Sequence, residues 1–193
     1  MRKLFCVLAL LSVLLVSACS AESTSGPATS TSGDSAVLDR LGFAELSGKQ
    51  IVEKLDTSPD ARPMAFSASV RPGGVMLADD QGEVTVPLPA DEFYLSVAPY
   101  VTRTHPCHFH SLATCNGELK GVDIAVKITA ADGTVLVDEQ TTTHTGNGFI
   151  GYWVPRGQTG TVQITTADGK SGSAAFSAVT DEDATCMTTL QVR

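Results

Sequence analysis

Residues 126–133 read Val-Lys-Ile-Thr-Ala-Ala-Asp-Gly, and residues 162–169 repeat this stretch as Val-Gln-Ile-Thr-Thr-Ala-Asp-Gly, with six of the eight positions identical. Each Asp-Gly pair indicates a hairpin turn, because glycine accepts the positive φ that such turns need. Two copies are too few for a solenoid, which needs about three repeats or more. The pattern therefore predicts two similar hairpins in a C-terminal β-sandwich-like lobe.

Short strands are also expected outside this repeat. After Pro63 the hydrophobic period is two, and Pro, Gly and Asp turns separate the apolar runs. The strands expected before the repeat cover residues 66–70, 74–77, 83–86 and 93–97. A closing strand is expected over residues 186–192 at the C-terminus.

The region before Pro63 carries helical signals instead. Residues 36–41 form a short amphipathic segment that Gly42 ends, and Ser47 to Gln50 have the spacing of a capping box. The fold class is therefore predicted to be mainly β, with short N-terminal helices followed by antiparallel strands.

The N-terminus has the features of an export signal. Arg2 and Lys3 precede an apolar run over residues 4–16 that is shorter than a comfortable membrane span. The next residues, Val16-Ser17-Ala18-Cys19, resemble the lipobox of bacterial lipoproteins, which implies that Cys19 becomes the diacylated first residue. An ordinary secretory signal cut after Ala18 is the alternative. We expect an extracytoplasmic protein, lipid-anchored to the cell membrane on its periplasmic or cell-surface side.

A polar, flexible stretch follows the signal. Of the sixteen residues 20–35, twelve are Ser, Thr, Gly or Pro, and such a composition cannot bury enough apolar surface to offset the entropy of ordering. The expected organisation is a lipoprotein signal peptide over residues 1–18, a tether over 19–35 and a folded domain over 36–193. Within the domain we expect a helical and β lobe over 36–121 and the sandwich-like lobe over 122–193.

Charge and motifs exclude several classes of function. The 193 residues include 21 acidic and 13 basic ones, which gives a formal net charge of −8. This charge repels a phosphate backbone and gives no attraction to anionic lipid, so we expect no nucleic-acid partner and membrane contact through the lipid anchor only. The sequence has no Gly-rich phosphate loop, nucleophile elbow or HExxH motif, so hydrolytic catalysis has no candidate residues.

Soft metal ligands gather in one stretch of the sequence. Three cysteines remain once those of the signal and lipobox are set aside: Cys107, Cys115 and Cys186. Three of the four histidines surround the first of these cysteines: His105, His108 and His110. Three converging thiolates suit Cu(I), whereas thiolate with imidazole also suits zinc, so both metals are candidates.

The spacing leaves a structural alternative open. In a straight strand Cys107 and Cys115 would lie about 26 Å apart, so the chain must fold back between them if their sulfurs act together. The alternative is a structural disulfide between these two residues. Cys186 would then be a small buried hydrophobe on the same face as Leu190 and Val192. The odd number of thiols disfavours a purely structural account.

Two further runs connect this stretch to a known family. Residues 93–100 read Phe-Tyr-Leu-Ser-Val-Ala-Pro-Tyr, and residues 104–119 contain Thr-His-x-Cys-x-x-His-Ser-Leu-x-Thr-Cys-x-Gly-Glu-Leu. Together they resemble the CueP family of exported copper-binding proteins. The resemblance implies that Cys107, Cys115 and Cys186 form the copper site. It also implies that copper is kept as Cu(I) for copper tolerance, that it passes to an extracytoplasmic enzyme such as superoxide dismutase, and that the protein is a homodimer.

The histidines receive different assignments. His105 and His110 are candidate metal ligands, or groups that hold a nearby thiolate. His108 would share a face with His110 on a strand, but we do not assign it to the site. His144 is expected to be a loop residue.

Three functions compete on these observations. The leading hypothesis is a lipid-tethered copper-binding protein rather than an enzyme. The second is a thiol-dependent Cu(II) reductase or disulfide-exchange protein, which would need a thiol reductase as partner. The third is an Ig-like surface module whose cysteines are structural. A Cys186 sulfur within about 5 Å of another cysteine sulfur would favour a shared metal site.

Overall fold

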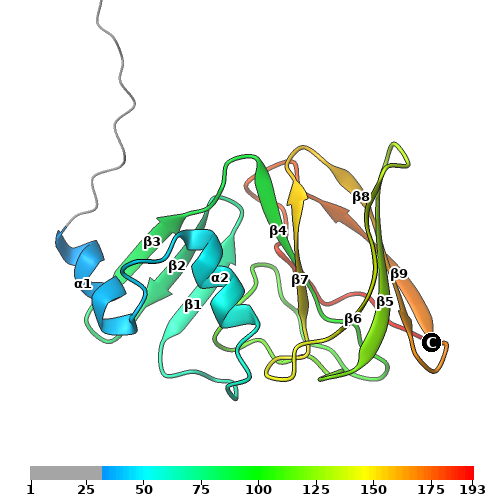
Figure 1. Cartoon of the computed structure of the whole chain (residues 1–193), viewed down its shortest axis with the longest axis horizontal. Helices are drawn as coiled ribbons and strands as arrows, with labels where there is room; N and C mark the ends of the chain where they lie inside the picture. Colours follow the sequence, from blue (N-terminus) through cyan, green and yellow to red (C-terminus); the bar gives the residue numbers. More distant parts are fainter. Residues whose placement is uncertain (1–31) are drawn as a thin grey trace, which may run out of the picture.

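The computed structural model describes residues 32–193. The predicted signal peptide, Cys19 and most of the predicted tether lie outside the described residues. Figure 1 shows a part made of helices and a small sheet on one side and a β-sandwich with the C-terminus on the other. The prediction of a mainly β fold with two short N-terminal helices is confirmed.

The two helices form where local signals place them, with one difference. Helix α1 (Ser32–Leu41) starts at Ser32 rather than at Ala36, inside the segment predicted as tether. Asp34 in its first turn favours this earlier start, because a carboxylate stabilises the positive end of a helix. Gly42, at φ 73°, follows the last helical residue as predicted.

Helix α2 (Gly48–Asp56) has the predicted capping box. The Ser47 hydroxyl accepts a hydrogen bond from the Gln50 amide, and the Gln50 side chain accepts one from the Ser47 amide at 2.9 Å. The helix buries Ile51, Val52 and Leu55 against the first sheet. This packing places the C-terminal end of α2 in the interior of the protein.

The first sheet is a three-stranded antiparallel meander. It consists of β1 (Ser67–Arg71), β2 (Gly74–Ala78) and β3 (Glu83–Pro87), in the order β1-β2-β3. These strands match the expected ones at 66–70, 74–77 and 83–86. Their buried side chains share one apolar cluster with both helices.

The repeated sequence forms the centre of the larger sheet. This sheet has the order β6-β5-β8-β9, with bounds β5 (Asp123–Ala130), β6 (Val135–Thr142), β8 (Thr159–Thr166) and β9 (Ser171–Ser177). The two copies lie in β5 and β8, which pair antiparallel so that Val126 faces Ile164. Each copy ends in the predicted hairpin turn, with Gly133 at φ 90° and Gly169 at φ 85°.

The second layer of the sandwich uses a strand from the N-terminal half of the chain. Its order is β10-β4-β7, with bounds β4 (Glu92–Val97), β7 (Ile150–Pro155) and β10 (Cys186–Met187). Phe93, Leu95 and Val97 of β4 belong to the sandwich core. The sandwich therefore does not consist of residues 122–193 alone, because β4 supplies the apolar face on which the larger sheet packs.

The predicted closing strand over residues 186–192 is wrong in length. Only Cys186 and Met187 form a strand, and β10 runs parallel to β4. The Ala98 amide donates to Met187 O and the Tyr100 amide donates to Leu190 O, so an extra residue between Met187 and Leu190 interrupts the ladder. Beyond it, pairing resumes only as an isolated bridge between Tyr100 and Gln191.

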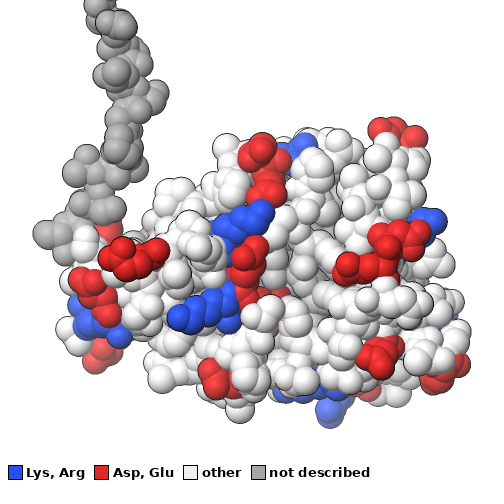
Figure 2. All heavy atoms as spheres, in the orientation of Figure 1, with Lys and Arg blue, Asp and Glu red and all other residues white. Residues whose placement is uncertain are grey.

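Charged side chains are mixed on the surface. Figure 2 shows acidic and basic groups interspersed over the face in view. Several of the basic groups are paired with acids, as Arg40 is with Asp79 and Lys49 with Glu92. Within residues 32–193, no helix combines the length and the apolar character needed to cross a bilayer.

Candidate metal centre

The candidate ligands lie mainly in the connection between β4 and β5, residues 98–122. This connection contains isolated bridges but no strand, and it lies along the edge of the first sheet. The amide of Val70 in β1 donates to His110 O at 2.8 Å, and the amide of Leu112 donates to Ala68 O at 2.9 Å. These bonds fix the backbone on both sides of Ser111.

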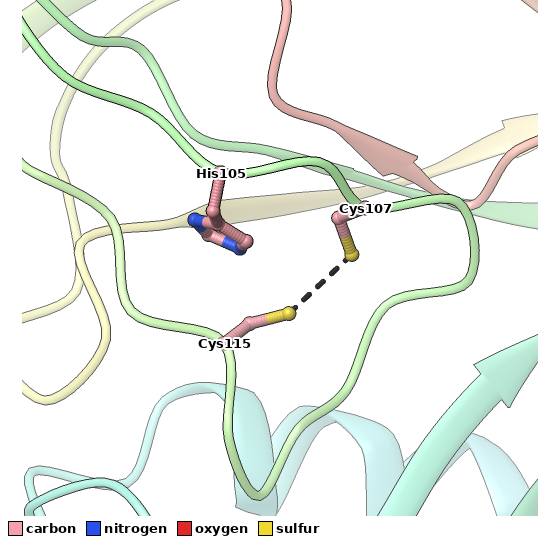
Figure 3. A group of neighbouring side chains, drawn as sticks. All are labelled: His105, Cys107 and Cys115. Atoms are coloured by element: carbon pink, nitrogen blue, oxygen red, sulfur yellow. Dashed lines mark hydrogen bonds between the residues drawn. The ribbon is translucent and has the colours of Figure 1, made fainter.

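The chain reverses direction just beyond these bonds. The amide of Thr114 donates to the Ser111 hydroxyl at 3.1 Å, and the amide of Cys115 donates to Ser111 O at 3.1 Å. The reversal brings Cys115 back to Cys107, with 3.4 Å between their sulfurs (Figure 3). A disulfide bond is about 2.05 Å long, and both residues are free cysteines.

Two groups of ligand atoms form around this reversal. Within each group, the atoms that could bind a metal all lie within 4.8 Å of one another. The first group is His105, Cys107 and Cys115, whose side chains point toward one another in Figure 3. The second is His110, Cys115 and Cys186. The structure thus brings all five sequence-predicted ligands together, and Cys115 belongs to both groups.

Strand β10 positions Cys186 beside the other ligands of the second group. The Cys186 amide donates to His108 O at 3.1 Å, which ties β10 to the histidine-rich stretch. Its side chain is 4% exposed and packs with Cys107, Cys115 and Phe149. The alternative in which Cys186 shares a face with Leu190 and Val192 is wrong, because those two side chains lie in the sandwich core. Strand alternation ends with β10 and so does not reach them.

His110 is held by a carboxylate that the sequence analysis did not identify. The His110 side chain is fully buried, and its Nε2 lies 2.8 Å from Oδ1 of Asp56. Its Nδ1 faces the thiols, 3.8 Å from Sγ of Cys186. Burial disfavours the charged ring, but the charge and hydrogen bond of Asp56 raise the pKa of His110 well above its usual value. A histidine held in this way through one nitrogen offers the other to a metal.

Asp56 is itself fully buried, at the C-terminal end of α2. The helix dipole disfavours a carboxylate there, so its partners must stabilise it. Its oxygens accept hydrogen bonds from the Tyr94 hydroxyl at 2.6 Å and from the Asn147 amide at 2.8 Å, as well as from His110. Burial alone would raise the pKa of Asp56, but these groups, His110 above all, lower it. The sequence signal was an acid beside Leu55, on the apolar face of a helix.

The contacts among the thiols shift the pKa values of Cys115 and Cys186 in opposite directions. Hydrogen bonds from Cys107 and Cys186, and then His110, lower the pKa of the Cys115 thiol. The same contacts, together with burial, raise the pKa of the Cys186 thiol. The contacts therefore favour the deprotonated form of Cys115 over that of Cys186. A thiolate in a buried pocket is the ligand that soft cations prefer.

The remaining histidines differ in their surroundings. The Nε2 atom of His105 is buried and has no hydrogen-bond partner among the described residues. His108 lies outside both ligand groups, and its Nε2 is 2.8 Å from Glu182 O. It does not share a face with His110, because this stretch is not a strand. His144 lies in a loop as expected, but its Nδ1 is 3.6 Å from Oδ2 of Asp56.

One side of the centre faces a pocket. A surface pocket of about 560 Å³ is lined by His105, Cys107 and Cys115. Neither His110 nor Cys186 lines it. An ion or a partner molecule would therefore meet the first ligand group before the second.

Comparison with known proteins agrees with this geometry. A family model described as "Periplasmic copper-binding protein CueP" matches residues 50–191, which include all five candidate ligands and Asp56. A solved structure described as "Crystal Structure of S.CueP" shares 40% sequence identity with this chain, at a TM-score of 0.79. That match covers 85% of this chain and 99% of the other. No curated protein sequence matches the chain. The chain belongs to the CueP family, whose description is that of periplasmic copper-binding proteins.

Proposed function

We propose that this protein binds Cu(I) through the thiolates of Cys107, Cys115 and Cys186, with His110 and His105 as nitrogen ligands. The observation that carries the proposal is the meeting of sulfurs from distant parts of the chain around Cys115. Thiolates are the preferred protein ligands of Cu(I). A thiolate ligand supplies the negative charge that a monovalent cation needs.

Cu(I) suits this centre better than a structural zinc ion does. A structural zinc site is almost always closed by four ligands in a tetrahedron. Each group here offers three ligand atoms, and the first group faces a pocket. An ion held by few ligands beside a pocket can be exchanged with another molecule, which a transport function requires.

The protein would act outside the cytoplasm. A diacylated Cys19 would keep the domain near the membrane. Bound copper would then serve copper tolerance and be passed to an extracytoplasmic copper enzyme such as a superoxide dismutase. The family description, a periplasmic copper-binding protein, supports the copper binding and the location outside the cytoplasm.

A second candidate function is reduction of Cu(II). The 3.4 Å between the sulfurs of Cys107 and Cys115 favours it, because a small movement would let them form a disulfide. In that reaction two Cu(II) ions take one electron each, the two thiols lose two protons and form one S–S bond, and two Cu(I) ions result. A thiol reductase would have to restore the thiols before the next cycle.

The proposal is tested by anaerobic titration with Cu(I) in competition with a coloured chelator. We expect about one Cu(I) per chain at high affinity, and an affinity lower by about a thousandfold in Cys115→Ser, since an essential soft ligand is lost. Thr114→Ala is the matched control, because Thr114 is exposed beside Cys115 and offers no sulfur. Unchanged Cu(I) affinity in Cys115→Ser would contradict copper binding and leave the cysteines a structural role.

Cu(II) addition without any external reductant tests the second candidate. Loss of two free thiols for every two Cu(I) formed would support the reductase. Formation of Cu(I) without thiol loss would exclude it. Neither result depends on how tightly Cu(I) is held.

A further inference from the structure

We propose that the centre holds copper at two overlapping positions that share Cys115, and that the ion moves between them while it stays bound to this residue. The outer position is formed by His105, Cys107 and Cys115. The inner position is formed by Cys115, Cys186 and His110. The inference rests on the proposed copper binding. It is carried by two ligand groups that have only Cys115 in common, each with all its ligand atoms within 4.8 Å.

The outer position is accessible from the surface. All three of its residues line the pocket, and two of them, His105 and Cys107, are only partly buried. The Nε2 atom of His105 has no hydrogen-bond partner within the described part of the chain, so its ring does not have to break a bond before it binds an ion. This position is where copper would enter and leave.

The inner position is closed and held in place. His110 is fully buried and Cys186 is 4% exposed, and neither lines the pocket. The bond to Asp56 orients the ring so that Nδ1 points to the thiols. Ligands that are already oriented lose little entropy on binding, so the ion should be held more tightly here.

Movement inward is an exchange of ligands in which copper remains Cu(I). The bonds from copper to Cys107 Sγ and His105 break, the bonds to Cys186 Sγ and His110 Nδ1 form, and the bond to Cys115 persists. Cys186 gives up its thiol proton when its bond to copper forms, and Cys107 takes up a proton when its bond to copper breaks. The numbers of protons lost and gained are equal, so no oxidant or reductant is needed.

The matched pair Cys107→Ser and Cys186→Ser tests this arrangement, since the same atom is replaced on either side of Cys115. Two quantities are measured without oxygen: the equilibrium Kd for Cu(I), and the rate at which bound Cu(I) passes to an excess of a coloured chelator. We expect Cys186→Ser to weaken binding by about 10–100-fold and to speed transfer, because only the outer position remains. Cys107→Ser should weaken binding by less than about tenfold and slow transfer by about tenfold or more.

Equal weakening in the two variants, with equal changes in transfer rate, would show one three-sulfur site and overturn the proposal. Failure of the unaltered protein to bind Cu(I) would instead remove the proposed function itself. The two failures are therefore distinguishable.

His105→Asn tests the outer position at a residue that is only partly buried, so the variant should still fold. We expect it to slow transfer of Cu(I) by about tenfold while Kd changes less than about threefold. His108→Asn is the matched control, because His108 lines the same pocket but belongs to neither group. A Kd that rises as much as it does in Cys186→Ser would mean that His105 belongs to a single resting site, and the proposal would be wrong.

Discussion

The sandwich and the connection between β4 and β5 are held by different kinds of contact. In the sandwich, two sheets pack apolar faces together, and backbone ladders join most of the strands along their length. The connection has isolated bridges only, and side chains bind its backbone, as Arg62 binds Leu112 O at 2.8 Å. Substitutions in the apolar core of the sandwich should therefore change stability alone. Substitutions among the polar contacts should change both stability and copper binding.

The largest effect is expected where the two kinds of contact meet, at Asp56. Replacing Asp56 with Ala leaves His110 buried without its partner, which should lower the free energy of unfolding by about 3–5 kcal/mol. Cu(I) affinity should also fall by about 10–100-fold, because the ring is no longer oriented. Urea denaturation and chelator competition measure the two effects.

Asp56→Asn is the control for this prediction. An amide oxygen can still accept a hydrogen bond from His110, so we expect most of the lost stability and affinity to return. A loss of about 0.5 kcal/mol or less in Asp56→Ala, as at an ordinary surface position, would contradict the importance given to this buried pair.

A substitution in the core of the sandwich should lower the stability of the protein without changing its affinity for Cu(I). Ile164 is fully buried in β8, and Ile164→Ala should cost about 2–5 kcal/mol of unfolding free energy. Cu(I) affinity, measured below the unfolding transition, should not change, because the centre lies in another cluster. A weaker copper affinity in this variant would show that the two regions are coupled and would remove the distinction between them.

Substitution of the turn glycine should destabilise the protein equally at the two hairpin turns. Gly133 and Gly169 both have a positive φ, and a Cβ at either position would meet nothing within 4 Å. Replacing either with Ala should therefore cost about 1–2 kcal/mol through backbone strain alone. Thermal unfolding of the two variants compares them directly. Clearly unequal costs would mean that the repeated sequence does not form equivalent turns.

The smallest expected effect concerns the backbone at the start of the connection. Glu118 accepts hydrogen bonds from the Thr102 hydroxyl and from the amides of Val101 and Thr102, which lower its pKa to about 2. Since the folded-state pKa is lowered, the stabilisation is present above the ordinary value of about 4.3 and is lost as pH falls toward 2. Carbon-13 NMR of the carboxyl group measures this pKa. A value near 4.3 would show that these bonds do not hold the connection.

Local signals predicted much of the fold. The capping box at Ser47 and the turn glycines Gly133 and Gly169 act on neighbouring residues, so they can be read from a few positions. The parallel pairing of β10 was not predictable in this way. It depends on contacts with Ser96 and Val97 of β4, which lie far from Cys186 in the sequence.

In the candidate centre, too, some residues could be predicted from the sequence and others could not. The five candidate ligands could be named from their chemistry and from the CueP resemblance. Asp56 could not, because it lies 54 residues before His110 and no motif connects them. The position of His144 close to the centre was missed for the same reason, since its neighbour there is Asp56. Long-range polar contacts of this kind leave almost no pattern in one sequence.

X-ray absorption at the copper K-edge, on the protein loaded with one equivalent of Cu(I), tests the central claim most directly. The account predicts two or three sulfur neighbours at about 2.3 Å from copper, with fewer in Cys115→Ser. A copper environment made only of nitrogen and oxygen neighbours would contradict it.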